Sequence, residues 1–155
     1  MPGRYTAPGT LTAVASGAKT IINIVQGATP RTRPIVFGVM LGYNGTPADN
    51  AMLADLVGMD ATGAGSGGSA ITPAPMDAGD PASNLTVTEN FATTEPTAVT
   101  RTLAEFPGHQ RTTIFVQLAE ENGWVLTGTA SHKIGARTLH ASYTGAASAT
   151  LYYRE

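Results

Sequence analysis

The chain has 155 residues, a formal net charge of −2 and no cysteine, so its length fits one domain with its own core, and disulfides and cysteine-based zinc sites are excluded. The nine basic residues are scattered, which argues against nucleic-acid binding, because that function needs a concentrated basic surface. The longest apolar run, Ile35 to Leu41, is too short to cross a bilayer, and the N-terminus lacks the apolar core of a signal peptide. We therefore expect no membrane association and no export.

Charged residues make up 13% of the chain, whereas an average soluble protein has about 25%. A surface with so few charges has little repulsion against self-association, so we expect part of it to be covered by other copies or by a larger partner. The alternative explanation is a neutral, threonine-rich β-protein without a special partner.

The N-terminal half begins with a segment, residues 1–9, whose two prolines and two glycines favour an extended arm or an edge segment over a central strand. Leu11–Ser16 and Ala18–Gln26 follow as strand candidates, because Thr, Val and Ile fit a pleated surface. Ile35–Leu41 is apolar on both faces, which indicates a buried central strand, although a buried helix has the same pattern.

The segment from Thr46 to Asp60 is ambiguous. Thr46 and Pro47 resemble the start of a helix, and apolar residues further on would line one helical face. The β-character of the rest of the chain favours a strand over Met52–Met59, with a first turn that could be helical. We predict the strand.

A glycine- and proline-rich stretch, Asp60–Pro81, occupies the middle of the chain. Its glycines favour an irregular backbone, and Pro73, Pro75 and Pro81 each remove an amide donor, so neither a helix nor a strand is expected to run through it. Loops this long are usually binding loops or linkers. We predict a long loop or arm, residues 60–82, inserted within one domain.

The C-terminal half contains short strand candidates separated by turn residues such as Pro107-Gly108 and Asn122-Gly123. The candidates are Leu85–Glu89, Ala98–Phe106, Thr112–Ala119, Gly123–Thr129, Arg137–Tyr143 and Ala149–Arg154. About nine or ten short strands without a long helix predict an all-β fold, an antiparallel sandwich, jelly roll or barrel, and of these we expect a β-sandwich that resembles a jelly roll. The prediction is a single domain over residues 1–155, because neither half alone would close both sheets.

No catalytic or metal-binding pattern stands out. Gly63, Gly65 and Gly68 match the dinucleotide fingerprint, but Pro73 and Pro75 exclude the helix that must receive the phosphates. The loop serines, Ser66 and Ser69, do not complete a nucleophile elbow, and the histidines, His109, His132 and His140, match no metal-binding spacing. The acidic run Asp77–Pro81 lacks the spacing of a calcium loop and is typical of a turn. We predict a protein that is not an enzyme and has no cofactor, with a cupin-like or hydrolytic barrel as a remote alternative.

Three segments resemble a family of small virion proteins of tailed bacteriophages and prophages. They are Gly3-Arg4-Tyr5-Thr6, the loop Gly65-Ser66-Gly67-Gly68-Ser69 with Thr72-Pro73, Pro75, Asp77 and Asp80, and the C-terminal Ala149–Glu155. The match covers both ends and the middle, whereas the intervening strands agree in spacing more than in identity. Arg154 departs from the acidic pair at the family's terminus.

The resemblance implies a capsid decoration (cement) protein, which binds the outer surface of a phage head as a homotrimer and stabilises it. The implied partners are further copies of the chain and the major capsid protein, and the implied location is the virion, after synthesis in the cytoplasm of a bacterial host. The alternative is a trimeric, β-rich, receptor- or glycan-binding head of a tail fibre or baseplate. The residues that we expect at partner contacts are Arg4, Tyr5, Gly63, Gly65, Gly67, Gly68, Pro73 and Pro75.

Overall fold

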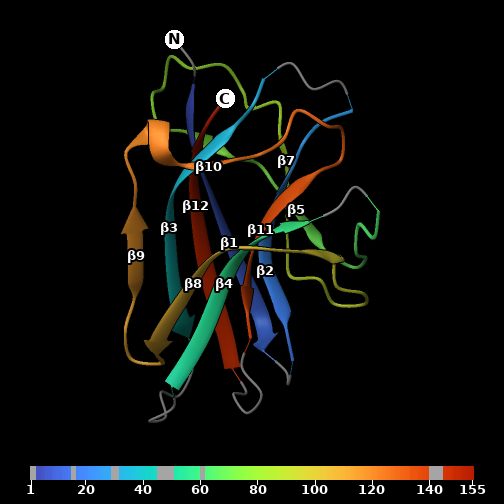
Figure 1. Cartoon of the computed structure of the whole chain (residues 1–155), viewed down its shortest axis with the longest axis vertical. Coiled ribbons are helices and arrows are strands. Elements are labelled where there is room, and N and C mark those ends of the chain that lie inside the picture. The colour runs from blue at the N-terminus through green and yellow to red at the C-terminus, as the bar shows by residue number, and fades with distance from the viewer. Residues whose placement is uncertain (1–2, 15–16, 29–31, 45–50, 60–61, 140–144) are drawn as a thin grey trace.

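Two antiparallel six-stranded sheets face each other in the computed structural model, which describes residues 3–14, 17–28, 32–44, 51–59, 62–139 and 145–155 (Figure 1). Sheet A has the strand order β10-β3-β12-β1-β6, and β9 pairs with β3 on the same side as β10. Sheet B has the order β5-β7-β2-β11-β4-β8. The predicted all-β sandwich is therefore confirmed.

The strands of sheet A are β1 (Arg4–Val14), β3 (Ile35–Asn44), β6 (Ala74–Pro75), β9 (Ile114–Gln117), β10 (Trp124–Val125) and β12 (Gly145–Arg154). The strands of sheet B are β2 (Lys19–Val25), β4 (Ala51–Met59), β5 (Ser69–Ile71), β7 (Thr86–Glu89), β8 (Ala98–His109) and β11 (Lys133–Thr138). A single 3₁₀ turn, η1 (Glu120–Asn122), joins β9 to β10.

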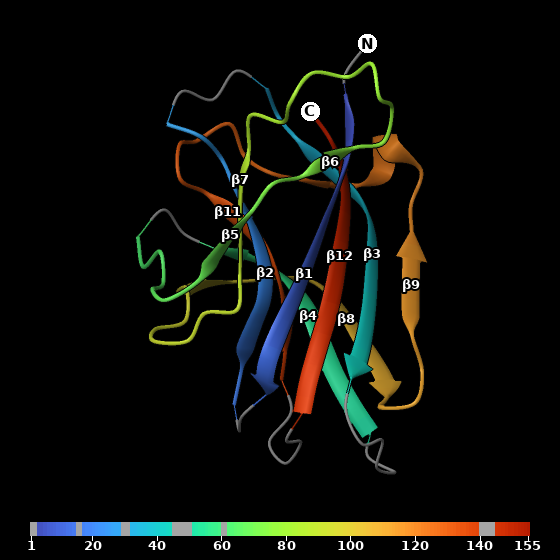
Figure 2. The same cartoon turned by 180° about the vertical axis from the view of Figure 1, so that it is seen from behind.

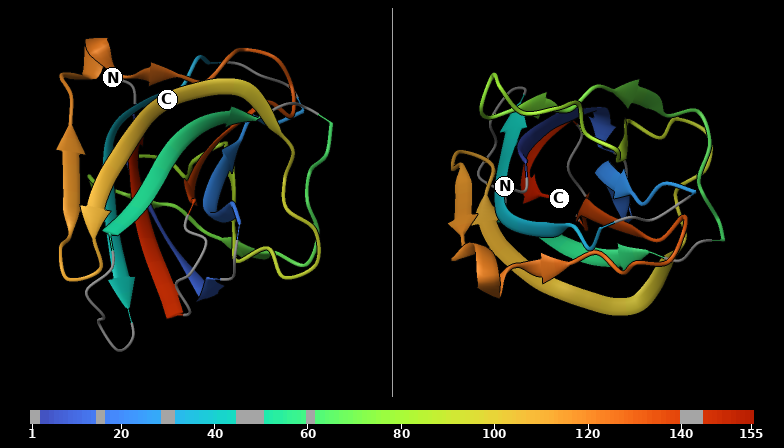
Figure 3. Two further views of the ribbon diagram at one scale, coloured as in Figure 1. Left: turned by 60° about the horizontal axis from the view of Figure 1, so that its bottom comes forward. Right: turned by 90° about the horizontal axis from the view of Figure 1, so that it is seen from above.

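The pairing of the long strands is nested along the chain. The first strand pairs with the last, β2 pairs with β11, β3 with β9, and β4 with β8. Strands that precede the glycine-rich stretch therefore alternate with strands that follow it in both sheets. In Figure 3, β8 curves strongly around β4, and the two irregularities in the β4–β8 register at Val57 provide the bulges that allow this bend.

The core lies between the sheets and follows the period of two expected for strands. Along β12, the buried positions alternate with half-buried ones, so Leu151 and Tyr153 point inward. A Cβ on Gly9 of β1 would lie 2.8 Å from Cβ of Ile22 on β2, so glycine is required where these two strands of opposite sheets meet. Burial of these inner faces supplies the main stabilisation of the fold.

Residues 4–9 do not form the predicted N-terminal arm, because they belong to β1, which pairs with β12 from Arg4 onward. The alternative, an edge segment, agrees with the structure, because β6 pairs only with Tyr5 and Thr6 on the other side of β1. Proline is tolerated at Pro8 because β6 pairs only with Tyr5 and Thr6, which leaves the rest of β1 as an edge strand. Side chains, rather than a further strand, bond to this edge. The backbone amides of Thr10 and Thr12 donate to the side chains of Glu89 and Asn90. Such a cover blocks further strand pairing at the edge.

The expectation that no strand crosses the glycine-rich stretch is also wrong, since β5 and β6 lie within it. The strands are short, three and two residues, and β5 pairs with β7 in sheet B while β6 pairs with β1 in sheet A. The insertion thus crosses from one sheet to the other, and Figure 2 shows it passing the end of β1 near both termini. Tertiary pairing overrides the weak local preference of this sequence.

Two other sequence predictions changed in detail. The predicted strand over residues 52–59 is confirmed as β4, whereas residues 45–50, where a helical first turn was considered, lie outside the described residues. The strand predicted at Arg137–Tyr143 begins earlier, at Lys133, and ends at Thr138. The early start of this strand was not predicted, because Lys133 and Gly135 interrupt the apolar alternation that marks a strand.

Candidate binding sites

The outer face of sheet A is exposed and carries no charged side chain along its middle. Cross-strand register places its residues in rows, because directly opposite residues share a face. The rows are Thr6, Tyr152, Gly38 and Gln117; Pro8, Thr150, Met40 and Phe115; Thr10, Ser148 and Gly42; and Ala146 with Asn44. We call this surface the sheet-A face.

Two large apolar side chains stand on the sheet-A face. Phe115 is 55% exposed and Met40, its cross-strand neighbour, is 36% exposed. The Phe115 ring packs edge-on against Tyr152 with ring centroids 5.8 Å apart. Gly38 makes room for the Tyr152 ring, since a Cβ there would lie 3.1 Å from it. The result is an aromatic pair on a neutral surface.

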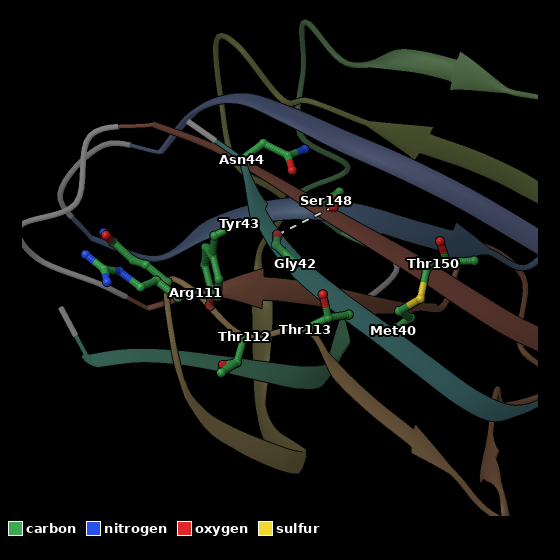
Figure 4. A pocket seen from close by; sticks show the side chains of 10 residues that line it. Met40, Gly42, Tyr43, Asn44, Arg111, Thr112, Thr113, Ser148 and Thr150 are labelled. Atoms are coloured by element: carbon green, nitrogen blue, oxygen red, sulfur yellow. Dashed lines mark hydrogen bonds between the residues drawn. The ribbon is translucent and has the colours of Figure 1, made fainter. Parts of the chain in front are cut away.

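A groove of about 480 Å³ lies at one end of the sheet-A face, where β3 and β12 meet the turn between β8 and β9. Figure 4 shows Ser148 on β12 beside Gly42 on β3, with Thr112 and Thr113 on that turn. Its lining residues are Met40, Gly42, Tyr43, Asn44, Gln110, Arg111, Thr112, Thr113, Ser148 and Thr150. These ten include no histidine and no carboxylate, so the groove offers hydrogen bonds but no acid–base pair.

The first half of the insertion, residues 62–68, is a fixed loop that we call the glycine loop. Three of its glycines, Gly63, Gly65 and Gly67, have φ angles of 63°, 76° and 74°, a region that favours glycine. Ser66 N donates to Thr94 O at 2.9 Å. The loop is thus held on the segment that follows β7, and a strand rather than a helix follows it, which excludes the phosphate-binding fingerprint.

The same glycines are required by close packing within the chain. A Cβ on Gly65 would lie 2.8 Å from the Phe91 ring, and one on Gly68 would lie 2.5 Å from the methyl group of Thr88. One on Gly63 would lie 2.0 Å from Oγ1 of Thr97. Internal packing therefore requires glycine at these positions, and the prediction that Gly63, Gly67 and Gly68 also contact a partner stays a prediction, since all three are exposed.

A cleft of about 390 Å³ lies between the glycine loop and the outer face of sheet B; we call it the loop cleft. Its lining residues are Asn23, Val25, Ala64, Gly65, Ser66, Gly67, Gly68, Thr88, Phe91, Ser131 and Lys133. Asn23 is 1% exposed and Lys133 is 3% exposed. Sequence reasoning placed Asn23 in a strand but found no site there, and the only signal was a polar residue within an isoleucine-rich run.

The second half of the insertion is clamped to the ends of β1 and β12 by two tyrosines. The rings of Tyr5 and Tyr153 stack with centroids 5.4 Å apart. Tyr5 Oη donates to Pro81 O at 2.9 Å, and Tyr153 Oη lies 2.7 Å from Ser83 Oγ. Tyr5 is 1% exposed, which corrects the prediction that it contacts a partner.

Both tyrosines are held in the neutral form by their surroundings. Burial, followed by the nearby carboxylates of Glu155 and Asp80, raises the pKa of Tyr5. Burial is also the main cause that raises the pKa of Tyr153, with Glu155 and Tyr5 adding to it and the Ser83 hydrogen bond opposing it. The clamp therefore requires neutral phenols.

The remaining predicted contact residues lie nearer the surface. The Arg4 side chain is exposed and forms an ion pair with Glu120 at 2.6 Å. Pro73 is half-buried between β5 and β6, and Pro75 is exposed on β6, opposite Tyr5. Arg4 and Pro75 thus remain accessible at the end of sheet A.

The residues considered for catalysis or metal binding are not brought together. No group of three or more His, Cys, Asp or Glu side chains is placed to hold a metal ion among the described residues, and His140 lies outside them. His132 Nδ1 lies 2.7 Å from Thr127 Oγ1. In the acidic run, Asp77 accepts from Gly79 N and Asp80 accepts from Arg4 N, which is turn and strand-end bonding.

Comparisons with known proteins found no matching family model, no similar curated protein and no similar solved structure. Within the described part of the chain, no helix is long and apolar enough to cross a membrane.

Proposed function

We propose that the protein is a non-enzymatic virion structural protein, a decoration (cement) protein that binds the outside of a bacteriophage head as a trimer and stabilises it. The observation that carries this proposal is the sheet-A face: an uncharged surface with Phe115 and Met40 exposed. The proposal assigns this face to the contact with the capsid shell.

The physical case rests on the cost of covering a surface. Removing charged groups from water costs much free energy, whereas burying threonine, glycine, alanine and aromatic side chains costs little. Interface centres are depleted in charge and enriched in aromatic residues and methionine. The sheet-A face has this composition, with Met40 and Tyr152 on its inner strands β3 and β12 and Phe115 on the edge strand β9.

The nested strand pairing supports the jelly-roll part of the proposal. The eight main strands form four pairs, which fall into two four-stranded sets, as expected for a double-sheet jelly roll. The pairs are β1–β12, β2–β11, β3–β9 and β4–β8. This architecture is common among viral capsid proteins. The short strands β5, β6 and β7 then form an addition between the fourth and fifth of eight main strands.

The insertion is packed against the rest of the domain, because its glycines and its contact with Tyr5 fit against other residues of the chain. Contacts to a partner would come from what stays exposed, such as Gly63, Gly67 and Gly68 in the loop, Met76, 53% exposed, and Arg4. Three such surfaces in a closed trimer would engage together, and binding of the first would make the others effectively intramolecular.

Charge insertion at the exposed aromatic ring of the sheet-A face tests the proposal. Phe115→Glu should leave folding intact, since the side chain is half exposed, and should lower binding to undecorated capsids at least tenfold, measured by cosedimentation. Thr102→Glu, on an exposed position of β8 in the other sheet, is the matched control and should bind normally. Equal binding of both variants would contradict the assignment of this face.

Two further measurements separate the proposal from its alternative. The native mass in solution should correspond to three chains, and a stable monomer would contradict the trimer. The number of copies per particle should be in the hundreds for a decoration protein, whereas a receptor- or glycan-binding tail component would be present in a few to tens of copies.

A further inference from the structure

The loop cleft contains a buried amide group that the described protein leaves unsatisfied. Asn23 lies in the middle of β2 at 1% exposure, and neither its Nδ2 nor its Oδ1 has a hydrogen-bond partner. Among the described residues it is the one carboxamide whose nitrogen and oxygen both lack a partner, and Thr20 and Thr138 have unpartnered hydroxyls. Buried polar groups are nearly always paired, so such a group calls for an explanation.

The surrounding strands explain why no internal partner reaches Asn23. Its cross-strand neighbours are Thr88 on β7 and Gly135 on β11. Gly135 has no side chain, and Met59 fills its place, since a Cβ there would lie 2.4 Å from the Met59 Cε. An apolar methyl group thus occupies one side of Asn23, and the loop cleft lies on the other.

We infer that the loop cleft binds an extended peptide segment, with the Asn23 carboxamide bonded to the N–H and C=O of one peptide residue. A carboxamide presents a donor and an acceptor on one edge. A residue in extended conformation directs its own N–H and C=O to the same side, as in the hydrogen-bonded pairs of an antiparallel ladder. The two edges are complementary, and one peptide residue satisfies both orphan atoms.

Other ligand classes fit the cleft less well. A carboxylate or phosphate would bond to Nδ2 but place a negative oxygen against Oδ1 of Asn23. A sugar is usually recognised with an aromatic platform, but the one aromatic lining residue, Phe91, is 5% exposed and lies under the glycines of the loop. The volume of about 390 Å³ is within the usual range of ligand sites, about 300–1,000 Å³.

The walls of the cleft are held in place, as a binding site requires. Ser131 has a φ angle of 64°, which is uncommon for a residue other than glycine, and its amide donates to Gln26 O at 3.0 Å. The opposite wall is fixed by the Ser66 to Thr94 bridge. Backbone held in a sparsely populated conformation is often found at ligand sites. The inference concerns the cleft alone and does not depend on the particle to which the protein binds.

Side-chain amide NMR tests the inference on the intact chain. A neutral blocked peptide, acetyl-Ala-Ala-Ala-methylamide, is titrated against ¹⁵N-labelled protein, with glucose and sodium acetate as comparison ligands. We expect saturable shifts of the Asn23 side-chain amide with the peptide alone. Absence of a shift with the peptide, or equal shifts with all three compounds, would overturn the inference.

A substitution of Asn23 provides a second test of the inference. Asn23→Leu should weaken peptide binding at least tenfold and raise the melting temperature, because it replaces an unsatisfied polar group with an apolar one of similar size. Asn122→Leu, at an exposed position in η1, is the control and should bind peptide normally. A fall in melting temperature for Asn23→Leu would show that fixed internal water satisfies the amide, and would overturn the inference.

Discussion

The outer faces of the two sheets differ in exposure and in the polar groups that they carry. The sheet-A face is partly exposed and uncharged, with Phe115 and Met40 on its surface. The outer face of sheet B is buried on its central strands and yet holds polar groups, among them Asn23, Asp55 and Lys133. If the proposed partner covers the sheet-A face, the absence of charge there lowers the cost of burial, whereas a face that the chain covers itself can hold charges if they are paired or bonded.

The difference arises from the insertion and from two side chains of sheet B. The glycine loop lies over the Asn23 end of sheet B, and no comparable segment covers the middle of the sheet-A face in the described structure. Beside the loop cleft, Arg137 on β11 binds Asp55 on β4 in a two-bond ion pair, at 3.0 Å and 2.6 Å. The following substitutions measure how much each face contributes to stability.

The largest effect is expected where a charge is buried. Asp55→Ala leaves the Arg137 guanidinium, 17% exposed, without its carboxylate partner, and should lower the free energy of unfolding by about 3–5 kcal/mol in urea titrations. The double variant Asp55→Leu with Arg137→Met should recover most of this loss, because no unpaired charge remains. A small effect of the single variant would contradict the buried ion pair.

Two phenylalanine substitutions, one on each face, compare how much each side chain contributes to stability. Phe91→Ala removes a buried ring beneath the glycine loop and should cost about 3 kcal/mol. Phe115→Ala removes a ring that is 55% exposed and should cost less than about 1 kcal/mol. Equal melting temperatures of the two variants would contradict the view that only sheet B is self-covered.

A pair of glycines separates backbone strain from packing. Gly17 and Gly65 have positive φ angles of 98° and 76°, so alanine is strained at both. Only at Gly65 does the new Cβ also meet other atoms, within 3 Å of the Phe91 ring and of backbone, whereas at Gly17 nothing lies within 4 Å. Gly65→Ala should cost about 1–3 kcal/mol and Gly17→Ala about 1 kcal/mol, measured by chemical denaturation.

The smallest effect at neutral pH concerns the tyrosine clamp. Tyr153→Phe removes the hydrogen bond to Ser83 and should cost about 1 kcal/mol at pH 7. Because burial raises the pKa of Tyr153 above its usual value of 10.0, the folded state keeps a proton that the unfolded state loses. Stability is therefore fully present below pH about 10 and falls above it.

An alkaline denaturation series checks the sign of this effect. The wild-type protein should lose stability as the pH rises above about 10, and Tyr153→Phe should lose less over the same range. Tyr152→Phe, on the exposed side of the same strand, is the control and should follow the wild type. Identical alkaline profiles for all three proteins would contradict neutral buried phenols as the cause.

Much of the β-architecture was predictable because alternation and turn residues are local signals. The strand at residues 35–41, the one at 52–59 and the C-terminal strand were all recognised, since each carries enough β-branched or apolar residues. Strands β5 and β6 were missed because their two or three residues carry no periodic signal. The early start of β11 was missed because Lys133 is polar, although it is buried.

The candidate sites depended on tertiary structure to a greater extent. The glycines of residues 63–68 were recognised as special, but their cause, contact with Phe91, Thr88 and Thr97, joins residues about 20 to 34 positions apart. The sheet-A face combines β1, β3, β9 and β12, which come from both ends and the middle of the chain. No local pattern marks a surface that exists only after four strands are paired.

The sequence by itself determined that this protein is an all-β sandwich without disulfides, because strand propensity, turn residues and cysteine content act locally. Only the tertiary structure decided which faces are covered. The register of β2 against β7 and β11 leaves Asn23 without a partner, and the path of the insertion places the glycine loop above it. Burial is a property of the assembled sheets, since a strand has two faces and its sequence alone does not state which of them will meet water.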